Sequence, residues 1–243
     1  MNKPKSFGRM AFLAAIQGVA LFAAAVALCG CETESSRNRK RATPNPPPPV
    51  AINAAAPEAG SGWRSLFDGK TLAGWAVTDF AGHGDVKVGG GKILLETGAM
   101  TGIHWTNEAA LLKINYEIAL DAMRTEGNDF FCGLTFPVKE DPCSLIVGGW
   151  GGGVVGLSSL DGQDAANNET TRYMNFDNGR WYAIRVRVTE TNISCWIDAD
   201  KVVDADTRDR GIGIRPEVES SRPLGVATWS TGAALKNIRT RKL

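Results

Sequence analysis

The stretch WYAIRVRVTETNISCWID, residues 181–198, alternates between apolar and polar side chains. Ile184 and Val186 fall on one parity, whereas Arg185 and Arg187 fall on the other. A period of two residues is typical of a β-strand that buries one face and exposes the opposite one. The alternation resumes after a short polar segment, so the stretch predicts an antiparallel hairpin.

The same alternation recurs along the chain from about residue 63 onward. KINYEIALDAM, residues 113–123, repeats it, and other short apolar runs are separated by glycine, proline, asparagine or aspartate. The best helical candidate, EAALLKI at 108–114, is brief and runs into a strand. Because crossover helices are missing, a parallel βαβ architecture is excluded. The sequence therefore predicts an all-β domain of two antiparallel sheets packed as a sandwich.

The amino terminus has the pattern of an export signal. A basic start is followed by the apolar run AFLAAIQGVALFAAAVAL, which predicts a signal peptide over residues 1–30. The following sequence Leu28-Cys29-Gly30-Cys31 resembles the lipobox of bacterial lipoproteins, which implies a lipidated Cys31 and attachment to a membrane. An uncleaved transmembrane anchor is the alternative. Both readings place the rest of the chain in the cell envelope, facing the periplasm or the exterior.

Residues 31–61 are rich in proline, alanine and charge, and they show no hydrophobic period. This composition predicts a disordered tether with a stiff spacer at Pro46–Pro49, and it leaves 62–243 as one folded domain. The basic run RNRKR could bind anionic headgroups or nucleic acid, but a solvated tether fits its place beside an acylation site. A formal net charge of +1 also argues against a nucleic-acid partner.

The cysteines of the domain predict buried free thiols. If FFCGLTF and CSLIVGG pair around the turn VKED, Phe136 faces Cys143 and Val147 faces Cys132. The two thiols then lie about 13 Å apart along the ladder, which is too far for a disulfide. Cys195 also has apolar neighbours, so a reactive nucleophile is not expected.

Five glycines surround Trp150 in the segment GGWGGG, residues 148–153. A phosphate-binding loop would open onto a helix, but this segment leads into another apolar run, VVGLSS. Glycines within strands mark bulges or places where a ligand approaches the backbone. Trp150 is therefore a candidate platform for a sugar ring, and the alternative is a hairpin turn whose tryptophan covers the sandwich edge.

No metal site or cofactor is expected. His83 and His104 are the only two histidines, and neither belongs to a zinc-binding motif. The oxygen-rich loop at 161–169 does not match the EF-hand spacing, which favours a solvated turn.

Carboxylates are the groups that glycoside hydrolysis usually needs, in a pair across the scissile bond. Asp129 precedes an apolar strand, and Glu217 lies in the charged segment RPEVESSR. A second candidate group, Arg185, Arg187 and Trp196, shares one polar sheet face and could line a groove, although cross-strand neutralisation of a solvated face explains the same residues.

Two stretches carry a resemblance to a known family. GWRSLFDGKTLAGW, at 62–75, and the run from GRWYAIRV at 179 to the closing KNIRTRKL resemble the 3-keto-disaccharide hydrolase domain family. The resemblance implies a jelly-roll sandwich of the concanavalin A-like lectin/glucanase type, carried by exported lipoproteins and acting on oxidised disaccharides or related glycosides. Polar family positions are replaced here near Cys143 and Ser144, and at Ala227, Thr228 and Trp229.

The sequence thus favours a lipid-anchored protein with a carbohydrate ligand and hydrolase-like activity. Asp129 and Glu217 are the predicted catalytic acid or base, Trp150 is the predicted platform, and Arg187 is a predicted anion or hydroxyl clamp. A non-catalytic lectin-like module and a structural envelope protein are the alternatives, and the replaced family positions favour the lectin-like one.

Overall fold

The segment 181–198 forms the predicted hairpin. Strand β11 (Trp181–Val188) pairs antiparallel with β12 (Asn192–Ile197), and Val188 lies opposite Ile193. The apolar side chains of this hairpin are buried, whereas its arginines are partly exposed.

The computed structural model describes residues 62–243. The expected signal peptide at 1–30, the lipidation site Cys31 and the tether at 31–61 lie outside the described residues. Within 62–243, no helix has the length and apolar character needed to cross a membrane.

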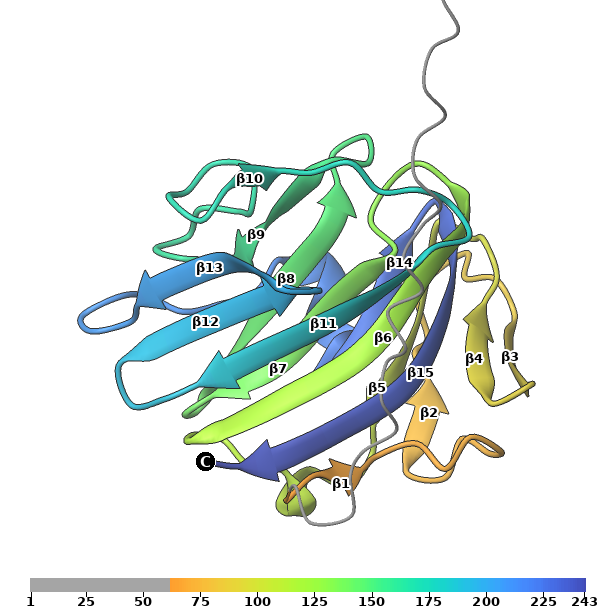
Figure 1. Cartoon of the computed structure of the whole chain (residues 1–243), viewed down its shortest axis with the longest axis horizontal. Helices are drawn as coiled ribbons and strands as arrows, with labels where there is room; N and C mark the ends of the chain where they lie inside the picture. Colours follow the sequence, from red (N-terminus) through yellow and green to blue (C-terminus); the bar gives the residue numbers. More distant parts are fainter. Residues whose placement is uncertain (1–61) are drawn as a thin grey trace, which may run out of the picture. The chain divides into compact units, whose positions relative to one another are not determined.

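Two antiparallel sheets pack against each other, with the β11–β12 hairpin in the larger one (Figure 1). The larger sheet contains, in spatial order, β13 (Asp200–Asp206), β12, β11, β6 (Tyr116–Gly127), β15 (Thr231–Lys242), β4 (Lys92–Leu95) and β3 (Val86–Gly89), with β1 (Arg64–Ser65) also paired to β15. The smaller sheet contains β10 (Arg172–Tyr173), β9 (Val154–Ser158), β8 (Asp141–Gly149), β7 (Cys132–Val138), β14 (Gly225–Trp229), β5 (Met100–Trp105) and β2 (Trp75–Val77). The predicted all-β jelly-roll sandwich is confirmed.

The core lies between the two sheets. Ile118 and Ile184 of the eight-stranded sheet and Leu134, Leu145 and Val226 of the seven-stranded sheet belong to one buried cluster. Because side chains alternate along a strand, the intervening residues of the seven-stranded sheet point away from this core. That outward face carries the site described below.

The β7–β8 hairpin has the register that the sequence predicts. Phe136 lies opposite Cys143, and Cys132 lies opposite Val147. Both of these cysteines and Cys195 are buried and free, as expected.

Helix is confined to two short 3-10 turns in the described residues, η1 (Glu108–Ala110) and η2 (Pro216–Ser221). The sequence does not predict η2, and one predicted strand is shorter than expected. The segment TRYMNF forms only the two-residue strand β10 because the chain then turns inward. Phe176 is buried there, with its ring centroid 5.3 Å from that of Phe131 and 5.0 Å from that of Tyr182.

Candidate functional site

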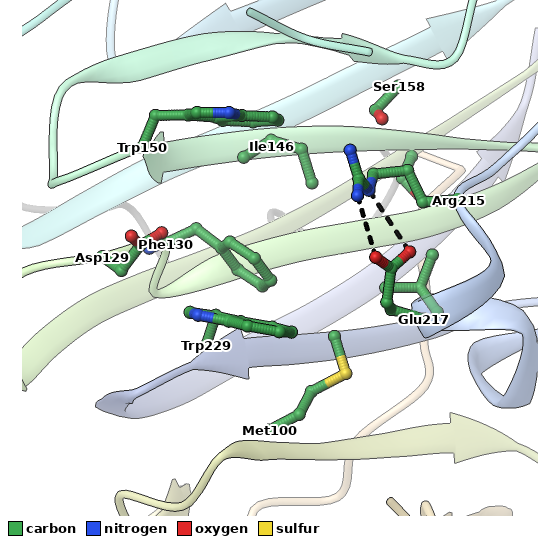
Figure 2. Close-up of a pocket in the computed structure, with 11 residues that line it drawn as sticks. Met100, Asp129, Phe130, Ile146, Trp150, Ser158, Arg215, Glu217 and Trp229 are labelled. Atoms are coloured by element: carbon green, nitrogen blue, oxygen red, sulfur yellow. Dashed lines mark hydrogen bonds and ion pairs between the residues drawn. The ribbon is translucent and has the colours of Figure 1, made fainter. Parts of the chain in front are cut away.

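A hollow of about 220 Å³ lies on the outward face of the seven-stranded sheet (Figure 2). Ser144 and Ile146 of β8 contribute to it, whereas Cys143 and Leu145 have the opposite parity and belong to the core. We call this hollow the aromatic pocket. Its lining residues are Met100, Asp129, Phe130, Ser144, Ile146, Trp150, Ser158, Arg215, Glu217, Val218 and Trp229.

Two tryptophans form facing sides of the aromatic pocket. Trp150 is 45% exposed and Trp229 is 41% exposed, although a large apolar side chain normally loses most of its exposure on folding. Figure 2 shows both indoles edge-on, with Phe130 between them. The rings of Phe130 and Trp229 have centroids 6.5 Å apart. This arrangement offers flat apolar surfaces to a ligand rather than to the core.

The glycine cluster forms the β8–β9 turn that presents Trp150. Trp150 itself has a φ of +49°, a left-handed conformation that is unfavourable for a bulky side chain, and Gly151 and Gly152 follow with φ of +84° and +110°. The two interpretations of this segment therefore combine. It is a hairpin turn, and its tryptophan lines a pocket.

Asp129 holds this turn in place. Its Oδ1 accepts a hydrogen bond from the Phe130 backbone N–H at 2.7 Å, and its Oδ2 accepts one from the Gly151 N–H at 3.1 Å. The Asp129 N–H in turn donates to Thr231 Oγ1 at 2.9 Å. The carboxylate thus joins the segment that precedes β7 to the turn that carries Trp150.

Glu217 lies in η2 at the other end of the aromatic pocket from Asp129 (Figure 2). Arg215 binds it in a bidentate manner, with Nη2 2.8 Å from Oε1 and Nε 3.3 Å from Oε2. Arg215 Nη1 also donates to Asp164 Oδ2 at 3.0 Å. The hydrogen bonds from Arg215 hold the pKa of Glu217 below its ordinary value, so this carboxylate is ionised at neutral pH.

Hydroxyl groups supply the polar part of the pocket floor. Ser144 Oγ lies 2.8 Å from Thr135 Oγ1 on the neighbouring strand. Ser158 lies opposite Ser144 in the β8–β9 ladder and is also buried. Among the described residues, no group forms a hydrogen bond with Ser158 Oγ.

The structure brings three predicted site residues together. Asp129, Trp150 and Glu217 come from segments far apart in the sequence, and all line the aromatic pocket. The other predicted group consists of Arg185, Arg187 and Trp196. These residues lie on the outward face of the eight-stranded sheet, and none of them lines this pocket.

The arginines of that second group form ion pairs with Glu117. Arg185 Nη1 and Arg187 Nε each lie 2.8 Å from Glu117 Oε1, and Arg241 Nε lies 2.6 Å from Oε2. The Arg185 guanidinium also stacks 3.8 Å from the Trp196 ring centroid. Burial alone would raise the pKa of Glu117, but the hydrogen bonds and charges of these arginines hold the pKa below its ordinary value. These contacts account for the residues structurally, and their role in ligand binding stays a prediction.

The site residues predicted from the sequence do not include Phe130, Trp229, Ser158 or Arg215, all of which line the pocket. The alternation along β14 could have identified Trp229. Val226 of this strand is buried, and Trp229, the last residue of the strand, has the opposite parity. Trp229 and Ser144, two of the positions at which the sequence is expected to depart from the family pattern, both line the aromatic pocket.

Neither histidine lines the pocket. His83 is exposed, and His104 Nδ1 lies 3.2 Å from Thr78 Oγ1. Over residues 62–243, no group of three or more His, Cys, Asp or Glu side chains is arranged to hold a metal ion.

The sequence matches the family model described as the 3-keto-alpha-glucoside-1,2-lyase-like domain over residues 62–241. This is the same family that the segments beginning at residues 62 and 179 resemble. A comparison with the curated proteins gives no match.

Solved structures with a similar fold include three named for carbohydrate chemistry. A provisionally assigned glycosyl hydrolase from Parabacteroides distasonis is 14% identical, with a TM-score of 0.49, covering 75% of this chain and 94% of that one. The carbohydrate-binding module CBM66 from Bacillus subtilis is 12% identical, with a TM-score of 0.47 and coverage of 70% and 96%. A Crh5 transglycosylase in complex with NAG is 12% identical, with a TM-score of 0.49 and coverage of 75% and 84%.

Proposed function

The chain belongs to the 3-keto-alpha-glucoside-1,2-lyase-like domain family, and from this premise we propose that the aromatic pocket binds a carbohydrate ring. The observation that carries the proposal is the pair of exposed indoles, Trp150 and Trp229, beside a floor that bears hydroxyl groups. The apolar C–H face of a sugar packs on an indole, while its hydroxyls need polar partners. The volume of about 220 Å³ suits one or two sugar rings that remain partly in solvent.

Sugar binding is tested by titrating the protein with methyl α-glucoside and its 3-keto derivative, followed by calorimetry and tryptophan fluorescence. Trp150→Ala and Trp229→Ala should each weaken binding by about ten-fold, since an aromatic contact contributes roughly 1 kcal/mol or more. Trp196→Ala is the matched control, because Trp196 lies on the other sheet. If only the control variant loses affinity, the Arg185–Arg187–Trp196 face is the binding site and the pocket is not.

A second candidate function is cleavage of a 3-keto glycoside, and the ionised Glu217 favours it. The C2–H of such a sugar lies next to the ketone and is acidic, so a carboxylate base can remove it. The C–H electron pair then forms the C1=C2 double bond as the C1–O bond breaks, and the departing oxygen takes a proton from solvent. This elimination needs one base, which Glu217 would supply once the ligand displaces one of its two hydrogen bonds from Arg215.

Hydrolysis of the same substrates is the competing reaction. It requires a carboxylic acid whose pKa is raised so that it can donate a proton to the leaving group. Glu217 has the opposite shift, and both oxygens of Asp129 accept backbone hydrogen bonds. Mass spectrometry separates the two reactions, because the sugar product of hydrolysis is heavier than that of elimination by one water.

Binding without any cleavage would instead make the protein a lectin-like module. Failure to bind any sugar, together with co-purification of an envelope protein, would favour a structural role.

We also propose that the chain is anchored through a lipid on Cys31 and faces away from the cytoplasm. Metabolic labelling with a radioactive fatty acid should mark the wild type but not Cys31→Ala.

A further inference from the structure

Ser158 carries a buried hydroxyl in the lining of the aromatic pocket. It is the last residue of β9, only 1% of it is exposed, and its side chain lines the hollow. Figure 2 shows the hydroxyl near the Arg215 end of the pocket. A buried hydroxyl without a partner costs about 1–3 kcal/mol, so such groups are usually satisfied in native proteins.

The polar groups around Ser158 are engaged with one another. Ser144, its neighbour across the ladder, is hydrogen-bonded to Thr135. Arg215 directs its side chain at Glu217 and Asp164. A ligand that enters the pocket can therefore supply the hydrogen bond that Ser158 does not receive from the described protein groups.

The charges around the pocket restrict which ligand fits. Among the residues that line it, all of them in the described part of the chain, Arg215 is the only cation. Its charge is already balanced by Glu217 and Asp164, and Asp129 adds a further carboxylate. A ligand carboxylate would face this negative excess without a free cation, whereas an uncharged ligand would not.

We propose that Ser158 is a specificity-determining residue of the aromatic pocket, that it hydrogen-bonds a hydroxyl or keto oxygen of a neutral sugar, and that the Arg215–Glu217 pair excludes uronic acids. This inference rests on the proposed sugar-binding function.

The experiment compares methyl α-glucoside, its 3-keto derivative and methyl α-glucuronide by calorimetry on the full chain. Ser158→Ala should weaken binding of at least one neutral sugar about ten-fold, which corresponds to one net hydrogen bond. Ser221→Ala is the matched control, because Ser221 is likewise buried without a hydrogen-bond partner in the described residues but lies outside the pocket lining. Its affinity should equal that of the wild type.

The uronic acid gives the second readout. The wild type should bind the glucuronide at least ten-fold more weakly than the neutral sugars, and Glu217→Gln should reduce this difference by freeing Arg215. Equal losses in Ser158→Ala and Ser221→Ala, or preference of the wild type for the glucuronide, would overturn the inference while sugar binding itself stands. Absence of binding by any of the three probes would overturn the proposed function and this inference together.

Discussion

The carboxylate of Asp129 accepts a hydrogen bond from the Gly151 backbone nitrogen, 3.1 Å away, and so connects the segment before β7 to the turn that carries Trp150. A second backbone amide, that of Phe130, occupies its other oxygen. A carboxylate used in this way orders a loop. It is less available as the acid or base that the sequence suggests.

Asp129→Asn separates the positioning role from the catalytic one. The amide keeps one oxygen acceptor, so the Trp150 turn should stay largely ordered, and sugar affinity and any turnover should remain near the wild type. Asp129→Ala removes both acceptors, so it should lower the free energy of unfolding by about 1–2 kcal/mol and weaken sugar binding several-fold. Urea unfolding and calorimetry measure both effects. Full binding with no turnover in Asp129→Asn would instead identify a catalytic group.

The pKa of Glu217 predicts the acid limit of any cleavage reaction. Because Arg215 holds that pKa below its ordinary value, the base remains ionised as the pH falls through the ordinary glutamate range near 4.3. The acid limb of kcat/KM should therefore lie below about pH 4.3. Glu217→Gln should abolish turnover but keep sugar binding. A limb near pH 6 in the wild type would assign the base to another group.

The strand pattern could be predicted from the sequence because it depends on local alternation. The β7–β8 register is an example, since a four-residue turn and paired prolines leave one alignment that buries Cys132 and Cys143 together. The insertion of β14 between β7 and β5 is a long-range pairing, and no local pattern reports it.

The same distinction explains the site. Trp150 was recognisable because five glycines surround it, but its partner Trp229 depends on where β14 lies. Arg185 and Trp196 have the parity of outward-facing residues, but a two-residue period does not say which sheet a strand joins. The alternation therefore did not reveal that they belong to the eight-stranded sheet, away from the aromatic pocket.

The three cysteines of the domain should resist alkylation while the protein is folded. Burial raises the pKa of both the Cys132 and Cys143 thiols to about 12 and that of Cys195 well above its ordinary value. The thiolate is the reactive form, so iodoacetamide at pH 8 should leave all three unmodified in the native state and modify them in denaturant. Peptide mapping by mass spectrometry identifies each site. Native-state labelling of Cys143 would show that the sheet interface opens there.

The Glu117 cluster should stabilise the eight-stranded sheet. Glu117 is fully buried, whereas Arg185, Arg187 and Arg241 are each about a third exposed. Removing the carboxylate charge leaves three close cations that water can partly solvate. Glu117→Gln should therefore lower the free energy of unfolding by about 2–3 kcal/mol, which is less than for a fully buried pair. Glu140→Gln is the control, since Glu140 forms an exposed pair with Lys113, and its effect on the free energy of unfolding should be much smaller.

The difference in the free energy of unfolding between the wild type and Glu117→Gln should depend on pH if it is electrostatic in origin. The pKa of Glu117 is lower in the folded protein than in the unfolded chain, so its contribution is complete above the unfolded value near 4.3. It should disappear as the pH falls through the lower folded pKa, because the protonated carboxyl no longer attracts the three guanidinium groups. Urea unfolding of the wild type and Glu117→Gln should therefore give the full difference at pH 7 and a shrinking one below about pH 4. A difference that stays constant with pH would mean that Glu117 acts through packing and hydrogen bonding that do not need its charge.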